Sequence, residues 1–414
     1  MTSNGQFDVD FARAQFPEGL WEWAFFENAG GAFVPESVIR RLTDYMRQCQ
    51  VQLGATFPAS LDAAGRVAEG QRAMAAMIGA DTDELVIAAS TSLNIYVLAH
   101  ALRPLWAEGD EIIVTNQNHE ANSTPWRRLA ESGIRIMEWP VHPDTGDLEI
   151  ELLDDLLSER TRLVAFPHVS NITGDINDVK AITDKVHAAG AQVCVDGVAY
   201  SPHRFSDVKA WDVDYYAFSF YKVFGPHVGG LYGKRERLLE ARGQYHDFVA
   251  EDAIPKKLSP SELQHEIVAS LAGIADYLDA LASHHLDEPP NDPTERTRAV
   301  FDLIAGHEQR LGEPLVDFVT SHPKVRLYGR PTADAAARAP TFSFAVDGMR
   351  SGDVVARLLD DKMAIKHGHF YAQRLVAALG FEDVEDGVVR VSMAHTNSED
   401  EVNRLVAALD RAIS

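Results

Sequence analysis

The sequence predicts an α/β fold, with a mostly parallel sheet in a large domain followed by a smaller C-terminal α+β domain. Strand-like apolar runs alternate with helical patterns over ~150 residues, which is typical of a parallel sheet with helices on both faces. Beyond Gly233 this alternation gives way to long helices and then to mixed strands and helices. The chain has 414 residues, 46% of them hydrophobic, so it can build a core large enough for two domains.

The individual elements follow from periodicity and end signals. Apolar runs bounded by turn residues predict strands over 85–89, 111–115, 134–139, 162–166, 192–197 and 214–219, and in the small domain over 325–328, 341–345 and 388–393. Apolar residues at helical spacing predict helices over 35–49, 93–105, 148–157, 178–189, 262–281 and 293–311. Ser398 and Glu401 form a capping box that predicts the start of the last helix.

Charge and composition limit the partners and the location. The formal net charge of −24 argues against nucleic acid and anionic membranes as partners, because both would repel the chain. The N-terminal stretch has neither the basic nor the apolar region of a signal peptide, and no apolar run reaches the ~18 residues of a membrane span. We therefore expect a cytoplasmic protein. Cys49 and Cys194 cannot build a disulfide framework and are expected to be core or half-buried thiols.

Lys222 lies between the strand expected over 214–219 and a glycine-rich turn. A lysine held among aromatic residues at a strand end loses part of its hydration, which lowers its pKa and makes its amine more nucleophilic. The alternative is an ordinary surface lysine beside a hairpin. Asp196 favours the first interpretation, because it ends the preceding strand and strand ends in a parallel sheet face one crevice. Taken alone, such an acid is more often a helix cap or a salt-bridge partner.

A lysine and an acid placed in this way are the pair that pyridoxal phosphate (PLP) needs. The lysine carries the cofactor as a Schiff base, and the carboxylate keeps the pyridine nitrogen protonated, so that the ring absorbs electrons from the substrate Cα. Ser90 and Thr91 open the helix expected over 93–105, and hydroxyl residues at a helix N-terminus suit a phosphate as well as a plain N-cap. The expected cofactor is therefore PLP.

Six motifs in order extend this interpretation to nearly the whole chain. They are FENAGG (26–31), NHEAN (118–122), HVSNITG (168–174), VDG (195–197), SFYK (219–222) and VRVS (389–392). By these motifs the sequence resembles the fold-type I PLP enzymes of the class V aminotransferase family, and within it the cysteine-desulfurase-like group. The resemblance implies a large PLP domain with a sheet of the seven-stranded type, a small C-terminal domain, and a homodimer with active sites at the subunit interface.

The resemblance also implies roles for particular residues. Lys222, His119 and Asp196 would be catalytic, with the imidazole of His119 stacked on the cofactor ring. The implied cofactor-binding residues are Ser90, Thr91, His119, Asn171, Asp196, Ser219, Tyr221 and Lys222. The implied substrate-binding residues are Asn28, Ala29, Gly30, Asn171, His369, Tyr371 and Arg390, the last as the partner of the α-carboxylate. The alternatives are a solvent-facing cap for His119 and ordinary surface residues for His369, Tyr371 and Arg390.

The departures from the family concern both chemistry and cofactor. Tyr371 stands where cysteine desulfurases carry the nucleophilic cysteine, so sulfur transfer through a persulfide on that loop is not expected. Tyr221 replaces a histidine before the lysine, and Ala199 replaces a glutamine after Asp196. The Gly-Thr pair that often reaches the neighbouring subunit's phosphate would fall near 261–262. His367 and His369, without a third ligand nearby, do not predict a metal.

The expected activity is PLP-dependent chemistry at the Cα of a small amino acid, through an aldimine and a Cα carbanion. We favour β-elimination, as in a C–S lyase, because the relatives cleave that bond. An aminotransferase and an amino-acid epimerase remain open, as does a scaffold without catalysis. The expected division is an N-terminal segment 1–28 packed on the small domain, a PLP-binding domain 29–285 and a small domain 286–414.

Overall fold

The largest element of the fold is a seven-stranded sheet with the order β2-β8-β7-β6-β5-β3-β4. The computed structural model describes residues 7–414, so the first six residues of the segment expected at 1–28 lie outside the described residues. The strands, in sheet order, are β2 Leu85–Ala88, β8 Gly229–Gly233, β7 Tyr215–Ser219, β6 Gln192–Asp196, β5 Thr161–Pro167, β3 Glu111–Thr115 and β4 Arg135–Trp139. Only β8 runs antiparallel to its neighbours, which confirms the mostly parallel sheet.

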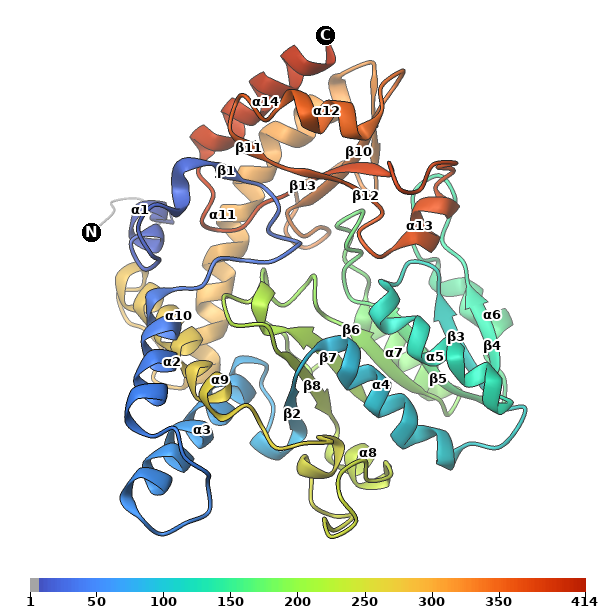
Figure 1. Cartoon of the computed structure of the whole chain (residues 1–414). Helices are drawn as coiled ribbons and strands as arrows, with labels where there is room; N and C mark the ends of the chain where they lie inside the picture. Colours follow the sequence, from blue (N-terminus) through green and yellow to red (C-terminus); the bar gives the residue numbers. More distant parts are fainter. Residues whose placement is uncertain (1–6) are drawn as a thin grey trace.

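The strands are buried on both faces, which explains their continuous apolar character. Along β6, Val193 and Val195 point into one core, whereas Cys194 points into the other. Helices cover both sides of this sheet (Figure 1). One core is completed by α2 Glu36–Gln48, α3 Pro58–Met77, α7 Val179–Ala188, α9 His265–Ser270 and α10 Ala272–His285. The other is completed by α4 Thr91–Leu102, α5 Thr124–Arg127 and α8 Arg235–Glu240.

A second, antiparallel sheet lies above the large one in Figure 1 and has the order β12-β13-β10-β9. Its strands are β12 Lys366–Gly368, β13 Val388–Ser392, β10 Thr341–Val346 and β9 Val325–Tyr328. The helices of this region are the C-terminal half of α11 Pro293–Ser321, with α12 Ser351–Arg357, α13 Gln373–Ala378 and α14 Glu399–Ile413. The capping box of Ser398 and Glu401 starts α14 as predicted.

The N-terminal segment, expected to pack on the small domain, contributes to both cores. Phe7, Ala12 and Phe16 are buried in the core of the large sheet, and only the residues around β1 Ala24–Phe25 join the second core. After α1 Val9–Arg13, strand β1 pairs in parallel with β11 Met363–Ala364, and Phe26 is buried in the small core. Helix α11 contributes Ile304 to the large core and Leu311 to the small one. Because one helix serves both cores, the division at residue 285 stays a proposal.

Three predicted helices differ in extent. Helix α11 continues ten residues past Leu311, through Gly312 and Pro314, because Leu315 and Val319 are buried in the small core and packing outweighs two poor helix formers. The single helix predicted over 262–281 begins at His265 and is divided at Leu271 into α9 and α10. The helix predicted over 148–157 is a 3-10 turn followed by the single turn α6 Leu153–Leu156.

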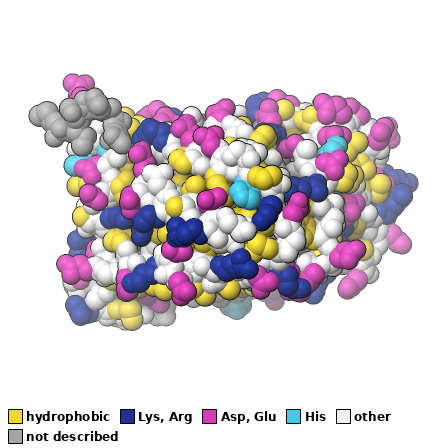
Figure 2. All heavy atoms as spheres, turned by 90° about the horizontal axis from the view of Figure 1, so that it is seen from above, with side chains coloured by type: hydrophobic (Ala, Val, Ile, Leu, Met, Phe, Trp, Pro, Cys, Tyr) yellow, Lys and Arg dark blue, Asp and Glu magenta, His cyan; other side chains and the backbone are white. Residues whose placement is uncertain are grey.

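Charged side chains of both signs are interspersed over the face seen in Figure 2. Within residues 7–414, the structure contains no helix with the length and apolarity that a membrane crossing requires.

Candidate active site

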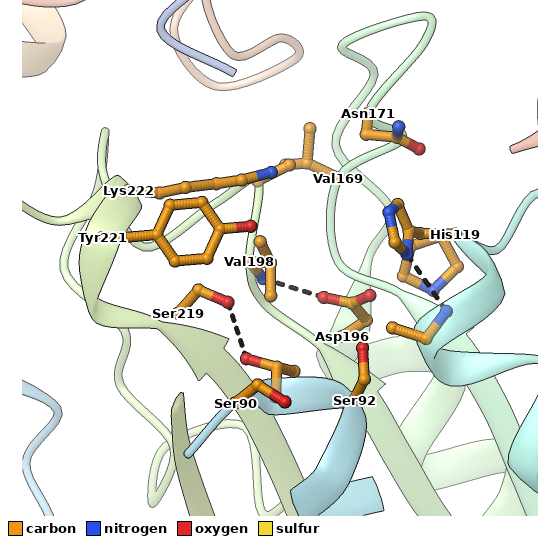
Figure 3. A pocket seen from close by; sticks show the side chains of 14 residues that line it. Ser90, Ser92, His119, Val169, Asn171, Asp196, Val198, Ser219, Tyr221 and Lys222 are labelled. Atoms are coloured by element: carbon orange, nitrogen blue, oxygen red, sulfur yellow. Dashed lines mark hydrogen bonds between the residues drawn. The ribbon is translucent and has the colours of Figure 1, made fainter. Parts of the chain in front are cut away.

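The candidate site lies at the carboxyl ends of β6 and β7, where parallel strands bring their last residues to one edge of the sheet (Figure 3). Asp196 is the last residue of β6, and Lys222 ends the 3-10 turn Phe220–Lys222 that follows β7. Both residues line one cavity together with His119 and Asn171. The strand-end arrangement expected from the sequence is therefore present.

Lys222 carries a buried amine with an unusual protonation equilibrium. The residue is 7% exposed, and burial, assisted by the charge of Arg390, lowers its pKa to about 8. The charges of Asp196 and Glu27 oppose this shift. Within residues 7–414 its Nζ atom makes neither a hydrogen bond nor an ion pair. With a pKa of about 8, roughly a tenth of the amine is unprotonated at pH 7 and available as a nucleophile or a base.

Asp196 is held at the bottom of the cavity. Its Oδ1 accepts a hydrogen bond from the backbone N–H of Val198 at 2.9 Å. Burial raises the pKa of the carboxyl group, while that N–H and the charge of Lys222 act in the opposite direction. A further cationic donor that faced this carboxylate would therefore offset the energetic cost of burying its negative charge.

His119 follows β3 and faces the same cavity as a neutral ring. Its Nδ1 accepts a hydrogen bond from the N–H of Ala121 at 3.0 Å, which places the imidazole proton on Nε2. Burial, followed by the charges of Lys222 and Arg390, lowers its pKa to about 3. The imidazole therefore stays uncharged at neutral pH and presents a flat aromatic face.

Two asparagines of the same motif hold the His119 loop in place, and neither was predicted as a site residue from the sequence. Asn118 Nδ2 donates to the carbonyl of Ala165 at 2.9 Å, and Asn122 Nδ2 donates to that of Cys194 at 3.2 Å. Both amides thus tie the loop to strands β5 and β6. The two asparagines that flank the histidine in the NHEAN motif were the sequence feature from which these loop contacts could have been predicted.

The N-terminus of α4 forms the other end of the cavity. Ser90 is its N-cap and accepts from the N–H of Leu93 at 3.1 Å. Thr91 Oγ1 lies 2.6 Å from the carbonyl of Phe218 and 2.6 Å from Ser219 Oγ, so its hydroxyl is already engaged. The backbone N–H groups of Thr91 and Ser92 have no hydrogen-bond acceptor among the described residues, and such groups favour an anion at a helix N-terminus.

Arg390 projects from β13 and is buried at 2% exposure. Its Nη1 donates to the carbonyl of Asn171 at 3.0 Å, and Phe370 covers the guanidinium at 3.6 Å from the ring centre. Its Nη2 donates to Glu27 Oε1, also at 3.0 Å. Neither Glu27 nor Phe370 was predicted as a site residue from the sequence, although Glu27 lies within the FENAGG motif.

Ser90, Thr91, Asp196 and Ser219 line the cavity described first, whereas His119, Asn171 and Lys222 also line a second, adjoining cavity of about 540 Å³, which Arg390 shares. Its lining includes the following residues predicted from sequence: Ala29, Gly30, His119, Asn171, Tyr221, Lys222, Tyr371 and Arg390. The structure does not bring Asn28 or His369 into this lining. Asn28 instead donates to Asn397 Oδ1 at 3.2 Å, and His369 Nδ1 accepts from the N–H of Tyr371 at 3.1 Å.

The loop that carries Tyr371 closes one side of the cavity. Phe370 and Tyr371 have positive φ angles of 47° and 59°, which are costly for residues with side chains. The Phe370 carbonyl accepts from Asn171 Nδ2 at 2.9 Å, and the Tyr371 carbonyl accepts from the N–H of Glu120 at 2.8 Å. Contacts with the large domain thus hold this backbone. His367 turns toward Asp386, and no cluster of three or more potential metal-binding side chains occurs within residues 7–414.

The residues at the site fit PLP. Lys222 offers a free amine for an aldehyde, and Asp196 offers a buried carboxylate for a protonated ring nitrogen. The open N–H groups of α4 suit a phosphate. Asn171 Oδ1 is buried and has no hydrogen-bond partner among the described residues, as expected for a group that faces a ligand.

Comparison with known proteins supports the same assignment. The model of the class V aminotransferase family matches residues 24–405. The aminotransferase-like protein FGM3 of Gibberella zeae is 38% identical over 99% of this chain and 100% of its own length. The cysteine desulfurase-like protein ustD of Aspergillus flavus is 33% identical over 98% of this chain and 91% of its own length. The cysteine desulfurase CsdA of Escherichia coli matches with a TM-score of 0.82 and 26% identity, over 98% of each chain.

The matches run through both sheets and all the motifs named above, from the N-terminal segment to α14. The chain therefore belongs to the class V aminotransferase family, and it is a PLP-dependent enzyme of fold-type I with cysteine-desulfurase-like relatives.

Proposed function

We propose that this enzyme acts on a small amino acid by removing its Cα proton and expelling a β-substituent, as a PLP-dependent lyase does. The observation that carries the proposal is the buried, partly unprotonated amine of Lys222 in a cavity that also contains Arg390. When bound, PLP supplies an electron sink for negative charge that develops at Cα. The names of the relatives ustD and CsdA support cleavage at the β-carbon.

The other site residues have distinct proposed roles. Arg390 binds the substrate α-carboxylate, and Lys222 Nζ takes the Cα proton. Asp196 holds a proton on the ring nitrogen, and the neutral imidazole of His119 packs on the ring face. The N-terminus of α4, with Ser90 and Thr91, takes the phosphate.

A persulfide route has no support in the described residues. Cys49 and Cys194 are both buried, and neither lines the cavity. Burial raises the pKa of both thiols, so the reactive thiolate is disfavoured. Tyr371 occupies the loop position at which the family's cysteine desulfurases carry the thiol.

An aminotransferase is the second candidate, because FGM3, at 38% identity, is described as aminotransferase-like. The two reactions share every residue described above. They differ in whether the β-substituent leaves or the cofactor keeps the amino group.

We further propose a cytoplasmic homodimer with its active sites at the subunit interface. The support for the homodimer is a set of exposed apolar side chains at the start of α3, on the first turn of α4 beside the phosphate-binding end, and on the loop after α8. They are Phe57, Leu61, Leu93 and Phe248, with exposures of 49%, 59%, 53% and 82%. Burial of these side chains against a second copy of the chain would remove them from water. Sedimentation analysis of the purified protein tests this proposal, and a monomer at micromolar concentration would contradict it.

An absorbance experiment tests the enzymatic proposal. The purified protein is expected to absorb near ~410–430 nm, and Lys222→Ala is expected to lose this band. Lys366→Ala, which removes an exposed lysine from the same cavity, should retain it. Pyruvate release from L-cysteine or cysteine sulfoxides selects the lyase. A lasting shift to ~330 nm with amino acids selects the aminotransferase. Absence of any band after incubation with PLP would refute both.

A further inference from the structure

Arg390 and Glu27 form an ion pair inside the cavity that is proposed to bind substrate. Glu27 Oε1 lies 3.0 Å from Arg390 Nη2, although 363 residues separate the two in the sequence. Glu27 follows β1 in the N-terminal segment and lines the cavity beside Lys222 and Gly30. A carboxylate of the chain itself therefore occupies the arginine.

The pairing is incomplete on both sides. Glu27 Oε2 is buried without a hydrogen-bond partner, and so is Arg390 Nε, within the part of the chain that the structure describes. A guanidinium and a carboxylate in their best arrangement form two parallel hydrogen bonds, whereas here only one is made. The contact thus neutralises the charge of the buried arginine but leaves Nε without an acceptor. A carboxylate placed to reach both Nη2 and Nε would form the two parallel hydrogen bonds.

Other parts of the guanidinium are already engaged. Its Nη1 is taken by the Asn171 carbonyl, and Phe370 covers one of its faces. Glu27 occupies Nη2, and a second carboxylate that reached Nη2 would meet the negative charge of Glu27. Both anions cannot share this donor without repulsion.

Gly30 is what allows Glu27 to lie there. A Cβ atom at position 30 would be only 2.6 Å from Glu27 Oε1, a distance that real Cβ contacts do not show. The side chain of Glu27 is 19% exposed, so it has an outlet toward solvent.

From this geometry we propose that Glu27 is a displaceable internal carboxylate, which holds Arg390 in the empty enzyme and leaves when a substrate carboxylate binds. The inference rests on the proposed role of Arg390 and adds a specificity residue to that site. It follows that Glu27 weakens the binding of every amino acid by the amount needed to displace it. Ligands without a carboxylate leave the pair intact and are not affected.

The test compares two ligands that differ only in the carboxylate, L-alanine and ethylamine. Their dissociation constants are measured on the holoenzyme by absorbance titration or calorimetry, so that turnover is not needed. Glu27→Gln keeps the size and removes the charge, and it is expected to bind L-alanine at least about tenfold more tightly. Binding of ethylamine should not change.

Two further variants make the result specific. Gly30→Ala pushes the carboxylate away from Arg390 without removing it, so it should also tighten L-alanine binding even if Glu27→Gln fails to fold. Glu120→Gln removes another carboxylate of the cavity lining, one that pairs with Arg374 at 3.2 Å, and should leave both affinities unchanged.

Unchanged or weaker L-alanine binding in Glu27→Gln and Gly30→Ala would overturn the inference, as would an equal gain for ethylamine. Arg390→Gln separates this failure from failure of the proposed function. If Arg390→Gln binds L-alanine as well as the wild type does, the carboxylate role of Arg390 is wrong and the inference falls with it. If that variant loses binding while Glu27→Gln gains none, only the displacement by substrate is refuted.

Discussion

Replacing Lys222 by methionine is expected to stabilise the cofactor-free protein at neutral pH. Lys222 is 7% exposed and its pKa is about 8, against 10.5 for a solvated lysine. At about 1.4 kcal/mol per pKa unit, burial of the charged amine costs roughly 3 kcal/mol. Methionine has a similar volume and no charge, so Lys222→Met should raise the free energy of unfolding by about that amount at pH 7.

The pH dependence gives the sharper test. Below about pH 8 the amine is protonated in both the folded and the unfolded chain, so the full cost is present. Between about pH 8 and 10.5 the unfolded chain binds the proton and the folded chain does not, so the wild type gains stability as the pH rises. The advantage of Lys222→Met should therefore shrink across this range and vanish above it.

Urea unfolding of the apoprotein, followed by tryptophan fluorescence at pH 7 and above pH 10, measures the difference. Lys366→Met is the matched control, because Lys366 lines the same cavity but is exposed, and its effect should stay within about 0.5 kcal/mol at both pH values. A variant less stable than the wild type at pH 7, or an advantage that does not change with pH, would refute the conclusion that Lys222 carries a costly buried charge.

Three other substitutions test separate parts of the site. Asp196→Asn should lower the catalytic rate by about 100-fold or more while the ~410–430 nm band persists, as measured by steady-state kinetics and absorbance. Gly229→Ala would place a Cβ atom 2.2 Å from the N atom of Thr91, so PLP affinity should fall by at least about tenfold in a cofactor titration. Gly65→Ala, whose Cβ would meet nothing within 4 Å, should retain that affinity. Tyr371→Gly should raise the free energy of unfolding by roughly 0.5–1 kcal/mol, because glycine tolerates the φ of 59°. A loss of stability there would mean that the tyrosine ring contributes more than its backbone strain costs.

Local sequence patterns were enough to predict the parallel sheet, the residues at its strand ends and the helix caps, because these features depend on residues that are close in sequence. The alternation of strands and helices predicted the parallel sheet, and a parallel sheet brings its strand ends to one edge. Asp196 and Lys222 could therefore be paired before any contact was known. The N-cap at Ser90 and the capping box at Ser398 follow equally from residues close in sequence.

The features that the sequence did not reveal depend on contacts between distant segments. The pair of Glu27 with Arg390 forms only because β1 and β13 belong to the same small core, and no periodicity records that packing. Asn28 was expected to face the substrate, yet its side-chain amide donates a hydrogen bond to Asn397 Oδ1 instead. Helix α11 was predicted too short for the same reason, since the burial of residues beyond Pro314 depends on strands that come later in the chain.

At position 371, the contacts that close the loop over the cavity are made by the backbone, whereas the side chain is free of them. The loop is held to the large domain by two backbone carbonyls, those of Phe370 and Tyr371, which accept from Asn171 and Glu120. Neither contact uses the Tyr371 side chain, which is 69% exposed and lies at the cavity lining. A different residue there would therefore leave the two carbonyl contacts in place and change only what the side chain touches, which includes the ring of His119 at 5.4 Å between centroids. Closure of the cavity over this site thus depends on the backbone of the loop, whereas the side chain at position 371 remains free to contact whatever the cavity holds.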